Sequence, residues 1–315
     1  MKSSEPSKVI FLFGPTAVGK TALLFNVFAH GFEVINADSV QVYRGLDIGS
    51  AKATIAEREA VPHHLIDIRD PWEDFSVGDF VTLADEAVSQ ITGRGNIPVV
   101  CGGTAYYFRH FLYGLSGGPK ADPVIRQKVF DLLEKNGRQW CYEELSRLDP
   151  SSALRIHPND VYRITRALEV CYTSGGRLSD YPVPTTPREG LDVLILGLTR
   201  PKDELDCRIR ERVDMMFEQG LVAEIESLIS RGAGLQWPSM KAIGYSEYLK
   251  AREAGEVDLD SVRQQIIMDS IHYAKRQRVF FNSFPSVHWV NPQTDAGEIA
   301  SLVSSFTRSK NDLDL

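Results

Sequence analysis

The stretch that decides the fold is GPTAVGKT, Gly14 to Thr21. It matches the pattern G-x-x-x-x-G-K-[ST] at every fixed position, which is typical of a phosphate-binding P-loop. In such a loop the glycines let backbone N–H groups approach phosphate oxygens, the lysine balances their charge, and the last hydroxyl holds Mg²⁺. We therefore predict that Thr21 is a metal ligand and that phosphate is bound by Gly14, Pro15, Thr16, Ala17, Val18, Gly19, Lys20 and Thr21.

The segments around this loop indicate an α/β fold. The apolar run KVIFLF before it predicts a buried strand, and helical spacing of apolar residues predicts a helix from about Lys20 to Ala29. Two more strands are predicted at FEVINADS, which ends at Asp38 and Ser39, and at NIPVVCGG, which is followed by Thr104. Strands that alternate with helices form a mostly parallel sheet, with ligands at the carboxyl ends of its strands.

The pattern changes after residue 122, where only helical spacing is found until about residue 172. Two of these helical segments, 123–137 and 159–176, end in glycine, as helices commonly do. The apolar run LDVLILGL, 191–198, then resembles the strands of the first part. We predict a P-loop NTPase-like parallel-sheet core of residues 1–122 and 191–315, interrupted by an inserted all-α domain of residues 123–190.

The C-terminal part predicts further helices. The first runs from Asp203, its expected cap, to Gly232, and two more are expected at 246–255 and 260–284.

Composition excludes several classes of protein. With 35 basic and 42 acidic residues the formal charge is −7, so a polyanion would have to be met by a local basic patch. The chain has no apolar segment of about 20 residues, and its first residues, MKSSEPSK, lack the apolar centre of a signal peptide, so a cytoplasmic protein without membrane contact is expected. The cysteines form no C-x-x-C pair and are expected to be buried thiols: Cys101, Cys141, Cys171 and Cys207.

A P-loop alone would suggest an ATP-binding kinase or NTPase, but those proteins usually carry a carboxylate at the end of a second apolar strand. Here NIPVVCGGT ends in glycines and Thr104. Asp38 is the strand-terminal carboxylate near the loop. It could be a helix cap or lie behind a metal ligand; we favour a general base that faces a bound acceptor.

Seven segments together resemble the ordered signature blocks of one family, the tRNA dimethylallyltransferases, also called tRNA isopentenyltransferases. In chain order they are GPTAVGKT, NADSVQVYRGLDIGSAK, VPHHLID, VVCGGTAYYFRHFLYGL, HPNDVYRITRALEV, MKAIGYSEYL and YAKRQRVFF. They extend from about residue 9 to residue 281, nearly the whole chain.

The resemblance implies a reaction. A dimethylallyl group passes from dimethylallyl diphosphate to the N6 amine of the adenosine immediately 3′ of the anticodon, in tRNAs that read codons beginning with U, and diphosphate leaves. The P-loop, with Mg²⁺, then holds the leaving diphosphate rather than a nucleotide, although a bare P-loop could also bind a nucleotide without turnover. A bacterial-type monomer is expected. Asp38 takes the proton of the amine, and Lys241 touches the diphosphate.

The resemblance also implies residues that contact tRNA. The block DSVQ contacts the target base through Asp38, Ser39, Val40 and Gln41. Thr104 matches a threonine near the acceptor adenosine, with a helix cap as the alternative. The inserted domain is expected to contact tRNA through Arg126, Tyr162, Arg163, Ile164, Thr165 and Arg166. Tyr162 stands where the family has Gln, so it could stack on a base instead, and Arg126 could simply be a helix-surface arginine.

Several basic residues have two interpretations. Arg208 and Arg212 match family arginines but could form ion pairs on a helix surface. Lys275, Arg276 and Arg278 could meet RNA backbone or lie on a solvated face. His63 and His64 are adjacent, and adjacent residues of a strand point to opposite faces, which disfavours a shared metal site.

Three other functions remain open at this point. An adenylate isopentenyltransferase would use the same chemistry, but the insertion with Arg163 and Arg166, together with KRQR, favours tRNA. A small-molecule kinase would need the missing carboxylate. A non-catalytic RNA-binding module would leave the complete P-loop unexplained.

Overall fold

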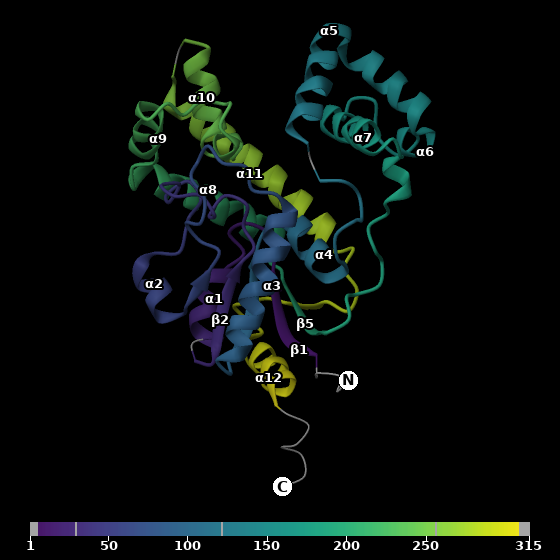
Figure 1. The fold of residues 1–315 in the computed structure, drawn as a ribbon. Helices are drawn as coiled ribbons and strands as arrows, with labels where there is room; N and C mark the ends of the chain where they lie inside the picture. The colour runs from purple at the N-terminus through teal and green to yellow at the C-terminus, as the bar shows by residue number, and fades with distance from the viewer. Residues whose placement is uncertain (1–5, 29, 121, 256, 309–315) are drawn as a thin grey trace. The chain divides into compact units, whose positions relative to one another are not determined.

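The computed structural model describes residues 6–28, 30–120, 122–255 and 257–308 (Figure 1). The chain divides into two compact units, one within Met1–Leu112 and Arg188–Leu315 and the other Tyr113–Pro187. We call the first the core unit and the second the helical unit. Because the helical unit lies between the two parts of the core unit in sequence, it is an insertion.

Among the described residues, six parallel strands form one sheet in the core unit, in the order β3-β2-β4-β1-β5-β6. The strands are β1 (Ser7–Phe13), β2 (Phe32–Asn36), β3 (His63–His64), β4 (Ile97–Gly102), β5 (Leu191–Leu198) and β6 (His288–Val290). The central strand β1 is fully buried from Val9 to Phe13. Strands covered on both faces read as continuous apolar runs, which is why VIFLF and LILGL lack alternation.

Helices cover this sheet and extend beyond it (Figure 1). They are α1 (Lys20–Val27), α2 (Ile55–Ala60), α3 (Val77–Gly93), α4 (Ala105–Tyr113), α8 (Lys202–Glu218), α9 (Leu221–Ser230), α10 (Ser246–Glu253), α11 (Leu259–Phe281) and α12 (Ala296–Thr307). A capping box of Ser76 and Asp79 starts α3, which packs on β4. The long α11 runs from α10 past α8 to the neighbourhood of α4.

Aromatic packing fixes the end of α11 against the central strand. The ring of Phe281, the last residue of α11, stacks on Phe13, the last residue of β1, with centroids 4.1 Å apart. Phe108 of α4 meets both rings edge-on. All three side chains are fully buried. The last turns of α11 are therefore held beside the segment that follows β1, which is the P-loop.

The parallel α/β core predicted from the sequence is confirmed, but two details of its helices are wrong. The helix expected from Asp203 to Gly232 is two helices, because Gly220 adopts φ 99° and ends the first of them. Asp203 is not the cap: α8 begins at Lys202 with Pro201 in the cap position, and Asp203 lies in the first turn. An acidic residue is favourable there because of the helix dipole. Ala29, the expected end of α1, lies outside the described residues.

The helical unit has its own core. Its helices are α5 (Pro123–Leu148), α6 (Pro150–Ala153) and α7 (Val161–Ser174). Gly137, with φ 80° and ψ 170°, interrupts α5 where the sequence predicted an end, and Gly175 closes α7 in the left-handed conformation. Val129, Leu145 and Leu168 are fully buried between the helices. The expectation of buried thiols holds for Cys141 and Cys171 here and for Cys101 in the core unit, but it is wrong for Cys207, which is exposed on α8.

Candidate active site

Four loops meet at the carboxyl edge of the sheet, because all of its strands run in the same direction. The P-loop follows β1, Asp38 follows β2, Thr104 follows β4 and Arg200 follows β5. In open α/β sheets this edge is where ligands bind.

Two arginines, one after β5 and one on α8, donate hydrogen bonds to the P-loop. Its carbonyl oxygens at Ala17 and Val18 accept hydrogen bonds from Arg208 Nε and Arg200 Nε, both at 2.8 Å. Gly19, at the head of α1, has φ 111°, a conformation that side chains rarely adopt. A Cβ at Gly14 would lie 2.8 Å from the carbonyl oxygen of Leu198 on β5. Both fixed glycines of the motif are therefore required by the backbone itself.

Lys20 lies folded over the loop. Its Nζ donates to the carbonyl oxygens of Gly14 and Pro15, at 2.9 and 3.0 Å. Burial lowers the pKa of Lys20 to about 8, the charge of Arg212 acts in the same direction, and the charge of Asp38 opposes the shift. A partly buried ammonium whose partners are carbonyl oxygens is ready to balance an anion.

The candidate base Asp38 opens a turn that joins two loops. Its Oδ1 accepts from the backbone N–H of Val40 at 2.9 Å and of Gln41 at 3.4 Å. The next amide, Ser39 N, donates to Thr104 Oγ1 at 3.0 Å. A Cβ at Gly102 would lie 2.2 Å from Ala37 O, so only glycine allows the two loops to approach this closely. The Thr104 hydroxyl thus binds the loop of Asp38.

A cavity of about 350 Å³ opens among these loops, α8 and α11. Six of its polar lining residues are Thr16, Asp38, Ser39, Arg212, Lys241 and Arg276. Its apolar wall includes Ile209, Val213 and Met216 of α8 and Ile266 of α11. One carboxylate, three cations and one P-loop residue therefore face a single space that also has an apolar side.

The structure brings some of the predicted residues to this cavity and not others. Thr16 of the P-loop and Val40 line the cavity. Gln41 does not line it, and its Nε2 donates to the carbonyl oxygens of Ser50 and Ala51, at 3.1 and 3.2 Å. Of the two α8 arginines, Arg212 lines the cavity and Arg208 holds the P-loop. Of the basic cluster on α11, Arg276 lines the cavity, while Lys275 and Arg278 are exposed elsewhere on the helix.

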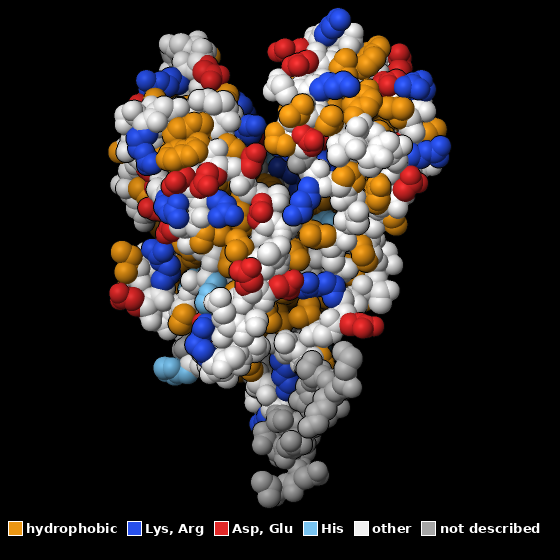
Figure 2. Space-filling view, in the orientation of Figure 1, with side chains coloured by type: hydrophobic (Ala, Val, Ile, Leu, Met, Phe, Trp, Pro, Cys, Tyr) orange, Lys and Arg blue, Asp and Glu red, His pale blue; other side chains and the backbone are white. Residues whose placement is uncertain are grey.

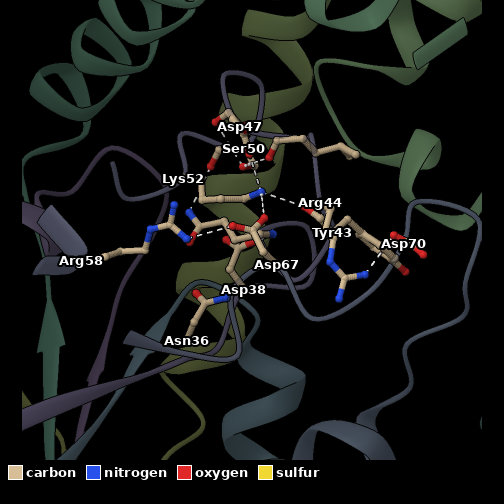
Figure 3. A network of polar contacts seen from close by, with 12 residues as sticks. Asn36, Asp38, Tyr43, Arg44, Asp47, Ser50, Lys52, Arg58, Asp67 and Asp70 are labelled. Atoms are coloured by element: carbon tan, nitrogen blue, oxygen red, sulfur yellow. Dashed lines mark hydrogen bonds and ion pairs between the residues drawn. The ribbon is translucent and has the colours of Figure 1, made fainter. Parts of the chain in front are cut away.

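A buried lysine that the sequence analysis did not single out supports the loop after Asp38 (Figure 3). Lys52 is 8% exposed, and its Nζ contacts Tyr43 O at 2.7 Å and one carboxylate oxygen each of Asp47 and Asp67 at 2.6 Å. Arg58 forms a further ion pair with Asp67. In sequence this lysine looks like any surface lysine after a turn, because all of its partners lie at least five positions away.

Two residues of α11 were also missed. Gln277 accepts a hydrogen bond from Thr16 N at 3.0 Å and donates to Gly103 O at 2.7 Å, while Tyr273 lines the cavity. Burial and the charge of Asp38 raise the pKa of Tyr273 to about 12, so it stays protonated at neutral pH. A signal was present: Tyr273, Gln277 and Phe281 are spaced by four, so a polar residue lies on the face of the helix that also carries Phe281.

In the helical unit the predicted tRNA contacts fall into three groups. Arg126 and Arg166 both bind the buried carboxylate of Glu169, at 3.3 and 3.0 Å. Tyr162 is 77% exposed and Arg163 is exposed beside Asp160. Ile164 and Thr165 are buried, so their side chains belong to the core of the unit.

His63 and His64 have separate structural partners. His63 Nδ1 lies 2.6 Å from Val61 O, and His64 Nε2 lies 2.7 Å from the buried carboxylate of Glu33. Arg94 also binds Glu33 with two hydrogen bonds and lowers the pKa of that carboxyl to about 2. Within the described part of the chain, no cluster of three His, Cys, Asp or Glu side chains could hold a metal ion.

The surface of the core unit carries both signs of charge. On the face shown in Figure 2, basic and acidic side chains are interspersed rather than gathered into one broad basic field. Within the described ranges, no helix has both the length and the apolar composition to cross a bilayer.

Comparison with known proteins identifies the family. A sequence model described as IPP transferase matches residues 41–284, and one described as isopentenyl transferase matches residues 7–70. A tRNA dimethylallyltransferase of Borrelia turicatae is 39% identical over 300 residues, which cover 95% of this chain and 99% of the relative.

Solved structures agree with the sequence comparison. The full-length tRNA isopentenylpyrophosphate transferase of Bacillus halodurans is 36% identical and superposes with a TM-score of 0.69, covering 98% of this chain and 99% of that one. A eukaryotic dimethylallyltransferase, in crystallographic snapshots of its action on tRNA, is 28% identical with a TM-score of 0.77, covering 95% of this chain and 79% of that one. The resemblance expected from the seven sequence blocks is confirmed, and the chain belongs to the IPP transferase family of tRNA dimethylallyltransferases.

Proposed function

We propose that this protein transfers a dimethylallyl group from dimethylallyl diphosphate to the N6 amine of the adenosine immediately 3′ of the anticodon, in tRNAs that read codons beginning with U. The observation that carries the proposal is the single cavity lined by Asp38, Arg212, Lys241 and the P-loop residue Thr16. It offers a proton acceptor, cations for a leaving diphosphate and an apolar wall for a short alkyl group.

Each part of this site has a role in the proposed reaction. The allylic C–O bond breaks and diphosphate leaves with the electron pair, stabilised by the P-loop amides, Lys20, Arg212 and Lys241. A C–N bond forms to N6, and Asp38 accepts the proton that the amine loses. The lone pair of an aromatic amine is delocalised into the ring, so removing the proton as the bond forms lowers the barrier. Ser39, Val40, Gln41 and Thr104 are proposed to contact the target base.

The residues present fit a Mg²⁺ ion held jointly with the diphosphate. Mg²⁺ commonly takes one or two protein oxygens and completes its coordination with phosphates and water. Thr21, in the first turn of α1 beside Lys20, offers a hydroxyl there. When bound, Mg²⁺ supplies positive charge to the departing diphosphate.

Binding of tRNA is proposed to involve the exposed Tyr162 and Arg163 together with Arg126 and Arg166 of the helical unit. An exposed aromatic ring can stack on an unpaired base, and arginines can bind the phosphate backbone. Because the net charge is −7, such local contacts would have to act without a broad basic field. We propose that the protein acts in the cytoplasm, since its tRNA substrates are there. We also propose that it acts as a monomer.

The test is transfer of label from dimethylallyl diphosphate to unmodified tRNA, with free AMP and with ATP plus tRNA as parallel reactions. We expect label in tRNA alone, on the adenosine 3′ of the anticodon, after nuclease digestion and chromatography. Label on AMP would instead indicate an adenylate isopentenyltransferase. Turnover of ATP without transfer would mean that the P-loop serves a nucleotide.

A further inference from the structure

One side chain of α11 connects the two halves of the candidate site. Gln277 Oε1 accepts from the backbone N–H of Thr16 in the P-loop, at 3.0 Å. Its Nε2 donates to the carbonyl oxygen of Gly103, at 2.7 Å. These partners lie 261 and 174 positions away in the sequence. The carboxamide therefore spans from the phosphate-binding loop to the loop that carries Thr104.

The carboxamide has little freedom to move. Gln277 is 5% exposed, and a Cβ built on Gly103 would lie 2.4 Å from its Nε2. The next atoms that such a Cβ would meet are 3.7 and 4.0 Å away. Gly103 does not have a positive φ, so its backbone conformation does not require glycine. Glycine is required there because the Gln277 side chain comes so close.

The residues one turn before and one turn after Gln277, on the same face of α11, also contact the core or the cavity. One turn later, Phe281 stacks on Phe13 at the end of β1. One turn earlier, Tyr273 lines the cavity, where hydrogen bonding with Thr104 and Gln277 partly opposes the rise of its pKa. A residue held in this way can transmit a small displacement of one loop to the other.

We propose that Gln277 is a positioning residue that couples the P-loop to the acceptor loop Gly102–Thr104, so that occupation of the P-loop by diphosphate fixes Thr104 and Ser39 for the acceptor base. The inference rests on the proposed function, because it assigns diphosphate to one loop and the acceptor to the other. For this role the Gln277 side chain does not need to contact either substrate. Its effect appears in the transition state, where both loops must be aligned at once.

Kinetics of two substitutions separate positioning from simple structural support. Gln277→Ala removes both bonds, and Gln277→Glu keeps an acceptor for Thr16 N but has no N–H for Gly103 O. For each variant we expect kcat to fall by about 10-fold to 100-fold, with the KM for dimethylallyl diphosphate within about threefold of the native value. A lower melting temperature with an unchanged kcat, corrected for the folded fraction, would mean that Gln277 only supports the fold.

A double-mutant cycle with Gly103 tests the bond itself. Gly103→Ala should displace the carboxamide and lower kcat on its own. In Gly103→Ala/Gln277→Ala the new methyl group meets open space, so we expect kcat within about threefold of Gln277→Ala alone. Multiplied losses in the double variant would contradict the proposal. Gly297→Ala is the matched control, because a Cβ there meets nothing within 4 Å and kcat should not change.

Hydrogen–deuterium exchange with inorganic pyrophosphate and Mg²⁺ tests the coupling without the reaction. In the native protein we expect pyrophosphate to slow exchange in residues 14–21 and also in residues 102–105. In Gln277→Ala the first protection should remain and the second should be lost. The inference would be overturned if pyrophosphate did not slow exchange in residues 102–105 of the native protein. It would also be overturned if this slowing persisted in Gln277→Ala. This result is obtained even if no tRNA is alkylated, an outcome that would overturn only the proposed function.

Discussion

Asp38 Oδ1 accepts a hydrogen bond from the backbone N–H of Val40 at 2.9 Å, so this oxygen stabilises the turn that follows β2. A general base at this position therefore has a structural role as well as a chemical one. The two can be separated, because an Asn side chain keeps the Oδ1 acceptor and loses only the basicity.

Asp38→Asn should lower kcat by about 10²-fold or more, as expected when a general base is lost. Binding of pyrophosphate, measured by calorimetry, should stay close to that of the native protein because the P-loop is untouched. Asp38→Ala loses the turn as well and should also lower the melting temperature. If Asp38→Asn turned over normally once saturated but no longer bound pyrophosphate, Asp38 would belong to the diphosphate site instead.

The affinity for pyrophosphate should fall as the pH rises through about 8, the pKa of Lys20 in the free protein. An anion beside the ammonium raises this pKa, so binding takes up a proton above pH 8 and is strongest below it. Calorimetric titrations between about pH 7 and 9.5 measure the slope, with Mg²⁺ held constant. Lys20→Arg is the control, because arginine stays charged over this range and leaves only the titration of pyrophosphate itself. Equal slopes for both proteins would exclude Lys20 as the titrating group.

Lys52→Met should destabilise the fold by about 1–3 kcal/mol, because it removes the donor to the Tyr43 carbonyl oxygen and the cation shared by Asp47 and Asp67. Urea denaturation followed by circular dichroism measures the change. Lys202→Met is the matched control: Lys202 forms an ion pair with Asp206, but its side chain is 68% exposed, so the midpoint should not move. An equal midpoint for the two variants would mean that the Lys52 cluster contributes nothing net.

Gly49→Ala should lower the free energy of unfolding by about 1–3 kcal/mol, because overpacking a filled site costs roughly that much. A Cβ at Gly49 would lie 2.6 Å from the ring of Tyr245, which is fully buried. Gly93→Ala serves as the comparison, since a Cβ there meets nothing within 4 Å and lies in helix α3. Alanine is the better helix former, so this second variant should be at least as stable as the native protein. Thermal melts of both variants decide the point.

Arg163→Ala should weaken tRNA binding and reduce the slope of log K against log salt concentration by about one, as expected for the loss of one phosphate contact. Its side chain is 70% exposed, so the melting temperature should not change. Arg147→Ala, an equally exposed arginine of the same unit that pairs with Glu144, is the control for the loss of charge alone. Filter binding over a salt series measures both slopes. A slope that changes equally in the two variants would argue against a specific contact at Arg163.

Local pattern was sufficient for the core of the fold. The runs VIFLF, FEVIN, IPVVCG and LDVLILGL are strands of the sheet, because segments buried on both faces are mostly apolar. In FEVIN the buried Glu33 is an exception, and Arg94 pairs with it. The three-residue strand β6 was missed, since three residues carry too little periodicity to read. The break at Gly220 was missed because apolar helical spacing continues on both sides of it.

The residues of the candidate site were predictable to different degrees. The P-loop and Asp38 carry local signals, namely fixed glycines and a carboxylate at the end of an apolar strand. Arg200 and Lys52 have no such signal, and Gln277 has only its spacing of four from Phe281 on α11. Each acts through hydrogen bonds to backbone or carboxylate atoms of segments that only folding brings near, such as Val18 O, 182 positions from Arg200. Side-chain type and spacing contain no record of such partners.

The sequence by itself determined the parallel α/β core, the phosphate-binding loop at the end of its first strand and the family to which the chain belongs. These follow from backbone requirements and apolar periodicity, which act over a few residues at a time. Tertiary structure alone decided that Arg212, Arg276 and Tyr273 share a cavity with Asp38 and that Gln277 joins the P-loop to Gly103. Those relationships depend on how α8 and α11 pack beside the sheet, and packing is a property of the whole chain rather than of any one segment.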